Sequence, residues 1–209
     1  WQRSAPICGK LMQPMYGREG EFVMAEIKRY PFIRHLRSDA SVHIARFRKG
    51  RLVRSGRGIA FWFVPASASV AELPMDDRDM VLFFNGRSKD FQAVTVQGNL
   101  TWRVADANVL NSRIDFSINL ASGRHQSNPI EQIEGLLTGM AQQIATQYFA
   151  ESSVHHLIDS GIEPLRSRLE ESLTGMARLQ EMGLEIVAIR LAAIAPTAEL
   201  ERALQTPTF

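Results

Sequence analysis

Few side chains in this sequence are of the kinds that carry out chemistry, and their spacing completes none of the usual sites. Histidines can bind a metal or act as bases, but no two of them share one helix face at metal-ligand spacing. His155 and His156 are adjacent, so on a helix they point in different directions and predict a surface pair. The five histidines are His35, His43, His125, His155 and His156.

Three further features could support chemistry, and each lacks a required part. Cys8 has no assignable base and is interpreted as an inert thiol. The acidic turn of Asp76, Asp77 and Asp79 lacks the glycine and the distal glutamate of a calcium loop, so we expect a solvated turn. Gly56-Arg57-Gly58 has no third glycine and no strand–turn–helix context, which argues against dinucleotide binding. With no G-x-S-x-G, P-loop or H-E-x-x-H motif, we expect no catalytic residue, metal ligand or cofactor; a hydrolase would need a nucleophile–base pair that we cannot assemble.

The positive feature is the apolar segment Ile59–Pro65, which carries three consecutive aromatic rings beside two arginines. Alternate residues of a strand point to opposite faces, so one face cannot bury all three rings. Rings beside cations suit a membrane interface, and they also suit single-stranded nucleic acid, which would use residues 46–63. Burial of the rings in the core is the third possibility. The residues chosen as membrane or partner contacts are Arg54, Arg57, Phe61, Trp62 and Phe63.

Composition and charge set the class of protein. The chain has 209 residues, one cysteine, 45% hydrophobic and 22% charged residues, which excludes disordered, collagen-like and disulfide-based chains. The longest apolar run, Ile59–Val64, is too short for a spanning helix of about 20 residues. Residues 1–60 hold 13 Lys/Arg and 4 Asp/Glu, a net +9, whereas residues 61–209 hold 11 and 18, a net −7. The basic part suggests an anionic partner, unless it only balances the acidic remainder.

The first half of the chain reads mainly as strands. Residues 21–36 are mixed apolar and basic around Pro31; we expect a short packed helix, with an interfacial stripe as the alternative. A hairpin with a basic tip is expected over 42–53. Met80 to Phe84 reads as a strand that ends in a turn at Asn85-Gly86. Residues 91–104 alternate with period two and predict the clearest strand, with Gly98 at a bulge or bend.

The second half reads mainly as helices. Asp106 is a candidate N-cap for a short helix, and a short strand or hairpin is expected over 114–120, closed by Ser122-Gly123. The pattern predicts a helix over 129–150, a short helix ending near Gly161, and a further helix from Pro164 that ends at Gly183. A strand follows over 184–194, and a last helix over 197–204.

These motifs, in this order, resemble one family. The segments that carry the resemblance begin with a G-x-G-hydrophobic entry, continue with a V-x-V strand ending in R-V-A-D, and close with I-A-P and E-L-x-x-A-L. They are Gly56–Pro65, Asp76–Asp79, Val94–Asp106, Gly183–Ile186, Ile194–Pro196 and Glu199–Leu204. The chain, over about residues 40–205, is similar to the SPFH or Band 7 family of stomatins, prohibitins and flotillins.

The resemblance implies an α+β fold and a function without catalysis. It implies a β-rich first subdomain over 39–105 and an α/β second subdomain over 106–205, whereas the residues themselves predict an N-terminal basic arm or amphipathic segment over 1–38. It further implies a membrane-associated scaffold that assembles with copies of itself, binds anionic lipid, organises membrane microdomains and in some cases regulates a membrane protease or other client. Nucleic acid is not an expected partner. We expect peripheral association with the cytoplasmic face of a membrane.

The resemblance also places contacts and terminal segments. The rings of Phe61, Trp62 and Phe63 fall where the family's first subdomain meets the bilayer. Oligomer contacts are assigned to Val187, Ile189 and Leu191. Family members usually carry an N-terminal hydrophobic anchor and a C-terminal coiled coil. Because the printed chain begins at Trp1, we expect residues before it, where such an anchor would lie.

Overall fold

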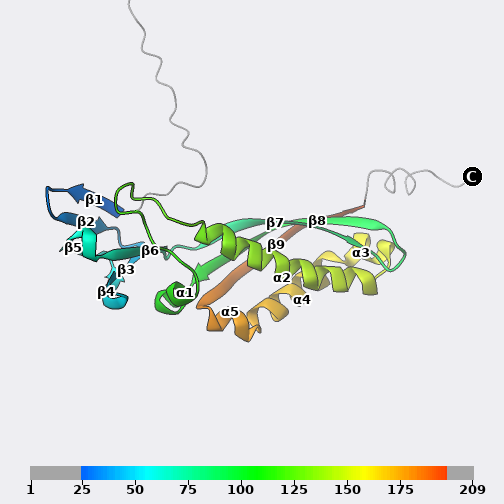
Figure 1. The fold of residues 1–209 in the computed structure, drawn as a ribbon. Coiled ribbons are helices and arrows are strands. Elements are labelled where there is room, and N and C mark those ends of the chain that lie inside the picture. Colours follow the sequence, from blue (N-terminus) through cyan, green and yellow to red (C-terminus); the bar gives the residue numbers. More distant parts are fainter. Residues whose placement is uncertain (1–24, 197–209) are drawn as a thin grey trace, which may run out of the picture.

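The computed structural model describes residues 25–196, which form three antiparallel sheets of three strands each, followed by helices. The fold is therefore of the mixed α+β class, as expected. The two sheets with shorter strands, β1 to β6, lie at one end of an elongated molecule. The third sheet runs along the other part, with a layer of helices on one of its faces (Figure 1). The strands are β1 Ala25–Arg29, β2 Arg34–Ser38, β3 Val42–Arg48, β4 Arg51–Arg57, β5 Ala60–Phe63, β6 Ser69–Pro74, β7 Arg78–Arg87, β8 Ala93–Val104 and β9 Leu184–Pro196. The helices are η1 Pro65–Ser67, α1 Ala107–Arg113, α2 Pro129–Glu151, α3 Val154–Ser160, α4 Ile162–Thr174 and α5 Ala177–Glu181.

The strand-rich end consists of sheet β1-β2-β5 and sheet β4-β3-β6. The expectation of a helix within 21–36 is wrong for the described residues, because β1 and β2 form a hairpin across Pro31. Proline removes a backbone donor and disfavours a continuous helix there. Leu36 packs in a separate small core with inward residues of β3, β5 and β6. This end thus has its own apolar centre, which fixes the faces of its strands.

The β3–β4 hairpin is confirmed. Lys49 and Gly50 both have positive φ, 52° and 75°, as a two-residue turn between right-twisted strands requires. A register shift between Arg46 and Phe47 leaves Val53 without a partner on β3, which makes it a β-bulge.

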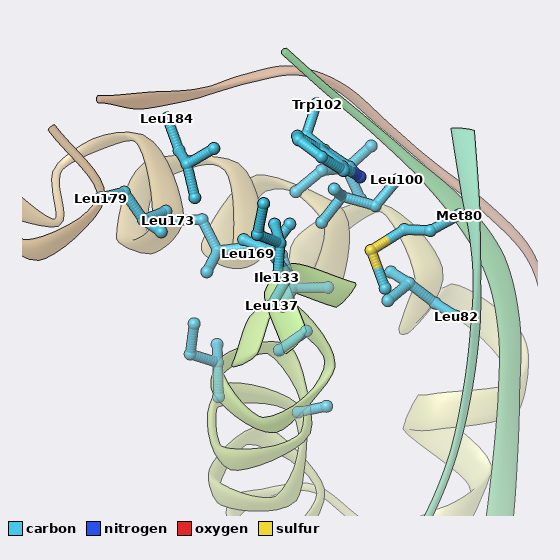
Figure 2. Close-up of a cluster of buried hydrophobic side chains, with 14 of the residues drawn as sticks. Met80, Leu82, Leu100, Trp102, Ile133, Leu137, Leu169, Leu173, Leu179 and Leu184 are labelled. Atoms are coloured by element: carbon cyan, nitrogen blue, oxygen red, sulfur yellow. The ribbon is translucent and has the colours of Figure 1, made fainter. Parts of the chain in front are cut away.

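The third sheet, in the order β7-β8-β9, carries the main core. Helices α2 and α4 cover one of its faces, and Figure 2 shows leucines from both helices meeting Trp102 and Leu100 of β8. The strand expected over 91–104 is confirmed as β8. The bulge expected at Gly98 lies opposite it on β9, where Ala192 has no partner because Gln97 pairs with Ala193 and Gly98 with Leu191. Because this sheet pairs β8 with β9, it joins residues on both sides of position 105, where the sequence places a subdomain boundary.

The predicted helices are found where residues at the helix end itself fix the start of the helix. The helix expected over 129–150 is α2, and Asp106 caps α1 by accepting hydrogen bonds from the backbone N–H groups of Asn108 and Val109. Gly183 has a φ of 73° and follows α5, as expected of a helix-ending glycine. The single helix expected from Pro164 to Gly183 is instead divided into α4 and α5, because Gly175 caps the end of α4 and Met176 precedes α5 in an extended conformation. The helix expected over 197–204 lies outside the described residues.

The turn predicted at Asn85-Gly86 is wrong. Asn85 and Gly86 do not form a turn but continue β7, and the chain reverses over residues 88–92. Gly86 is needed for clearance, because a Cβ there would lie 2.9 Å from Cε2 of Phe149, a buried ring of α2. The short strand or hairpin expected over 114–120 is present as a short hairpin, because Ile118 bridges His125 and the N–H of Asn119 donates to the carbonyl of Arg124 at 2.7 Å. Ser117 also bridges Ala71 of β6.

Candidate functional site

Exposed apolar side chains gather at the strand-rich end, on the β1–β2 turn and on β5. We call this cluster the aromatic tip; it consists of Tyr30, Phe32, Ile33, Trp62 and Val64. The backbone N–H of Tyr30 donates to the carbonyl of Ile33 at 3.0 Å and closes the turn, which leaves Phe32 86% exposed. The rings of Tyr30 and Trp62 lie 5.2 Å apart, so turn and strand form one patch. An exposed apolar patch of this kind marks an interaction site.

Strand alternation decides which of the three consecutive rings can meet a partner. Trp62 is 51% exposed, whereas Phe61 and Phe63 are 6% and 3% exposed and pack in the small core. The choice of Phe61 and Phe63 as contacts is therefore wrong for this fold. The residues that replace them, Tyr30, Phe32 and Ile33, lie on the β1–β2 turn. Phe32 and Ile33 belonged to the alternative stripe over 21–36, but only the strand geometry separates them from the inward-facing Leu36.

Basic side chains lie beside the aromatic tip. His35 pairs with Trp62 across β2 and β5, and their rings lie 4.7 Å apart. Arg46 donates to the backbone carbonyl of Trp62 at 3.3 Å, and its guanidinium carbon lies 5.3 Å from the centroid of the Phe61 ring. The Arg34 guanidinium instead donates to the carbonyl of Leu120, so it ties the tip to the loop before α2.

Arg54 and Arg57 lie apart from the aromatic tip, on β4 at the edge of the neighbouring sheet. Both side chains are exposed, as a contact with an anionic partner requires. Arg54 is the register partner of Arg46, and Arg57 that of His43. The structure therefore divides the predicted contact segment into an aromatic tip and a basic edge.

The three residues assigned to oligomer contacts differ in their exposure. Val187 is exposed, Ile189 is 2% exposed in the main core, and Leu191 is half-buried. The reason is a second bulge: Trp102 pairs with Ile186 and Thr101 with Ala188, so Val187 has no partner on β8. A bulge changes the alternation of the strand, and Ile189 is not available to a neighbouring subunit in this fold.

Two apolar residues on the outer face of the third sheet escaped the sequence analysis. Val81 and Phe83 of β7 are exposed and line a shallow groove of about 560 Å³, together with Leu191 and Arg190 of β9. In sequence they lie inside the continuous apolar run from Met80 to Phe84, which does not distinguish the two faces of a strand. This groove extends the surface that Val187 and Leu191 were expected to form.

Ionisable side chains are partly buried where the strand-rich end meets α2. Burial lowers the pKa of His125, and the nearby Arg78 adds to the lowering. Burial raises the pKa of Glu134, whereas Arg78 acts in the opposite direction. Burial and then Arg57 lower the pKa of His43. Both histidines thus favour the neutral form in the folded chain.

This burial predicts a pH-dependent stability. Because the folded-state pKa of His125 lies below its ordinary value of 6.5, the unfolded chain binds the proton more readily. As the pH falls below about 6.5, the native chain is expected to lose stability by at most about 1.4 kcal/mol per pH unit from this residue. Urea unfolding of the native chain and of His125→Gln from about pH 7.5 to 5.5 checks this, with His155→Gln, an exposed histidine, as control. The free energies of unfolding of the native chain and of His125→Gln should converge as the pH falls. If the two stay parallel over this pH range, the assignment to His125 is wrong.

The other sequence-predicted sites have simple structural explanations. Asp79 of the acidic turn accepts a hydrogen bond from the Thr101 hydroxyl, and Asp76 and Asp77 are exposed. Within residues 25–196, no three His, Cys, Asp or Glu side chains come together as a metal site would require. Cys8 lies outside the described residues. His155 and His156 are both exposed on α3, as expected of a surface pair.

The strand-rich end, followed by helices on a third sheet, defines a mixed α+β domain with exposed apolar surfaces. The chain belongs to the family described as SPFH domain / Band 7 family, whose sequence model matches residues 40–208. Members of this family are in general scaffolds without enzymatic activity and are in general associated with membranes. Comparison with curated proteins gave no match. Among the described helices, none combines the length and the apolar character needed to cross a bilayer.

Proposed function

We propose that this chain is a non-enzymatic scaffold that binds the surface of an anionic membrane through its aromatic tip. The observation that carries the proposal is the exposure of Phe32, Trp62 and Tyr30 on one patch, with cations beside it. Aromatic rings favour the boundary between headgroups and acyl chains, and basic side chains favour anionic headgroups. The scaffold would organise membrane microdomains or regulate a membrane protein complex, such as a protease, on the cytoplasmic face.

Assembly with copies of itself is the second part of the proposal. A few apolar side chains bind a bilayer weakly, but several linked subunits bind strongly because each bound subunit raises the effective concentration of the next. The outer face of the third sheet is the surface proposed for this contact, with Leu191 of β9 in the groove of Val81 and Phe83, and the exposed Val187 further along β9. Exposed apolar residues in that arrangement support a contact between subunits.

Flotation with lipid vesicles tests the proposal. The chain should float with vesicles that contain phosphatidylserine, float less with neutral vesicles, and lose most of this difference between about 0.05 and 0.5 M salt. Particles on the vesicles should be larger than single chains. Absence of flotation at low salt would contradict the membrane proposal.

Nucleic-acid binding remains the second candidate, because residues 46–63 are basic and include an exposed ring. Burial of Phe61 and Phe63 leaves Trp62 as the one exposed ring of that segment, whereas single strands bind through a series of stacked bases. Filter binding with single-stranded RNA and DNA at low salt is expected to be weaker than vesicle binding. Strong, ring-dependent binding would favour the second candidate.

A further inference from the structure

The turn of the β3–β4 hairpin and its strand β4 form a strongly basic surface on a different sheet from the β1, β2 and β5 strands of the aromatic tip. Residues 40–71 contain six Lys/Arg and no Asp/Glu. Five of the six cationic side chains are exposed, and within residues 25–196 none of these five forms an ion pair or a hydrogen bond. They are Arg48, Lys49, Arg51, Arg54 and Arg57. Their charge is therefore uncompensated in the described part of the chain.

The same hairpin offers a free strand edge. β4 is the last strand of the order β4-β3-β6 (Figure 1). Every residue in it except Gly56 is exposed. Among residues 25–196, β3 is the one strand that pairs with β4. A free edge presents backbone N–H and C=O groups to which an extended segment can add as a strand. The bulge at Val53 interrupts the edge, so Arg54–Arg57 is the regular part available for such pairing.

The charge on this edge decides which kind of partner fits it best. A second copy of β4 is disfavoured, because it would place arginines beside arginines. Single-stranded nucleic acid would need exposed rings, and the exposed apolar residues of the hairpin, Leu52 and Val53, are aliphatic. Lipid headgroups could bind the cations, but they would leave the regular backbone edge unpaired. An extended acidic segment satisfies both the cations and the edge.

We infer that β4 is a docking edge for an extended, acidic segment of a partner protein. The segment pairs as a strand alongside Arg54–Arg57, and its carboxylates lie near Arg54 and Arg57. This contact is independent of the aromatic tip, so one molecule can bind a membrane through the tip and a partner through the edge.

A designed peptide tests the inference with the whole chain. The probe is a peptide of about nine residues that alternates Glu and Val, labelled for fluorescence anisotropy. One control peptide carries Gln in place of Glu, and another carries N-methylated backbone nitrogens. The chain variant is Arg54→Glu with Arg57→Glu, and its matched control is Arg87→Glu with Arg178→Glu, which reverses two exposed arginines on other elements.

The inference expects the acidic peptide to bind, with affinity lowered at least about tenfold by Arg54→Glu with Arg57→Glu and by N-methylation, but not by the control variant. Hydrogen exchange should slow at residues 54–57. Equal binding of the N-methylated and normal peptides would overturn strand pairing, and no binding of the acidic peptide would overturn the site. If Arg54→Glu with Arg57→Glu weakens the binding of phosphatidylserine vesicles but not the binding of the peptide, the edge is a lipid surface and the inference is wrong. None of these outcomes depends on Phe32 or Trp62, so they are separate from the membrane proposal.

Discussion

Serine at both Phe32 and Trp62 is expected to lower the affinity of the chain for anionic vesicles about 100-fold. Full burial of such a side chain contributes about 1.5–3 kcal/mol, and partial insertion at a bilayer surface lies near the lower value. Two side chains at about 1.4 kcal/mol each give the factor of 100. Phe32 is 86% exposed, so its loss removes little packing from the folded chain. Titration with vesicles, followed by flotation, measures the change.

Phe91→Ser is the matched control for that result. Phe91 is 82% exposed, like Phe32, but it lies in the β7–β8 connection, at the far end of the molecule from the aromatic tip (Figure 1). The control should bind vesicles like the native chain, and urea unfolding should give similar stabilities for all three chains. Equal losses in the control and in the double variant would mean that exposed rings bind the bilayer without regard to position. If the double variant binds vesicles as tightly as the native chain, the aromatic tip is not the membrane-binding surface.

Salt dependence separates the two contributions to membrane binding. The double variant keeps Arg46, which lies beside Trp62, and the exposed arginines of β4, so its remaining affinity should fall with salt as steeply as that of the native chain. A flat salt response in both chains would show that the basic residues contribute little.

The elements that could be predicted from the sequence are those fixed by residues within the same segment, such as a helix cap or an alternating strand. Asp106 caps α1 because its carboxylate is two and three residues from the N–H groups that it accepts from. β8 could be predicted because it alternates along its whole length, with one face in the main core. The segment over 21–36 could not be predicted in this way. Its apolar residues fit a helical stripe, but β2 is fixed by pairing with β5, which lies far from it in the sequence.

The candidate site was partly predictable for the same reason. Alternation alone required that the three rings of β5 divide between two faces, and the structure agrees. Which of them faces solvent depends on pairing with β2, a contact distant in sequence. Val187 and Ile189 show the stronger limit: a bulge alters their faces, and no glycine lies opposite it on β8, as Gly98 lies opposite the other bulge of β9 at Ala192.

Alanine at Gly98 is expected to destabilise the chain by about 2–3 kcal/mol. The new Cβ would clash with the carbonyl oxygen of Arg190 and lie 2.9 Å from Cδ2 of Leu191, both in β9. Backbone atoms cannot yield as a flexible side-chain end can, so β8 and β9 must separate at the bulge. The lower entropy of the unfolded alanine chain offsets only about 0.4–1 kcal/mol.

The same substitution at Gly139 should have the opposite sign. Gly139 is exposed in the middle of α2, and no atom lies within 4 Å of the position that a Cβ would take. Alanine there is expected to stabilise the chain by up to about 1 kcal/mol, because glycine is the poorer helix former. Urea unfolding of both variants should therefore separate them by about 3 kcal/mol. If Gly98→Ala is as stable as the native chain, the close approach of β9 at this bulge is wrong, and with it the groove proposed for contacts between subunits.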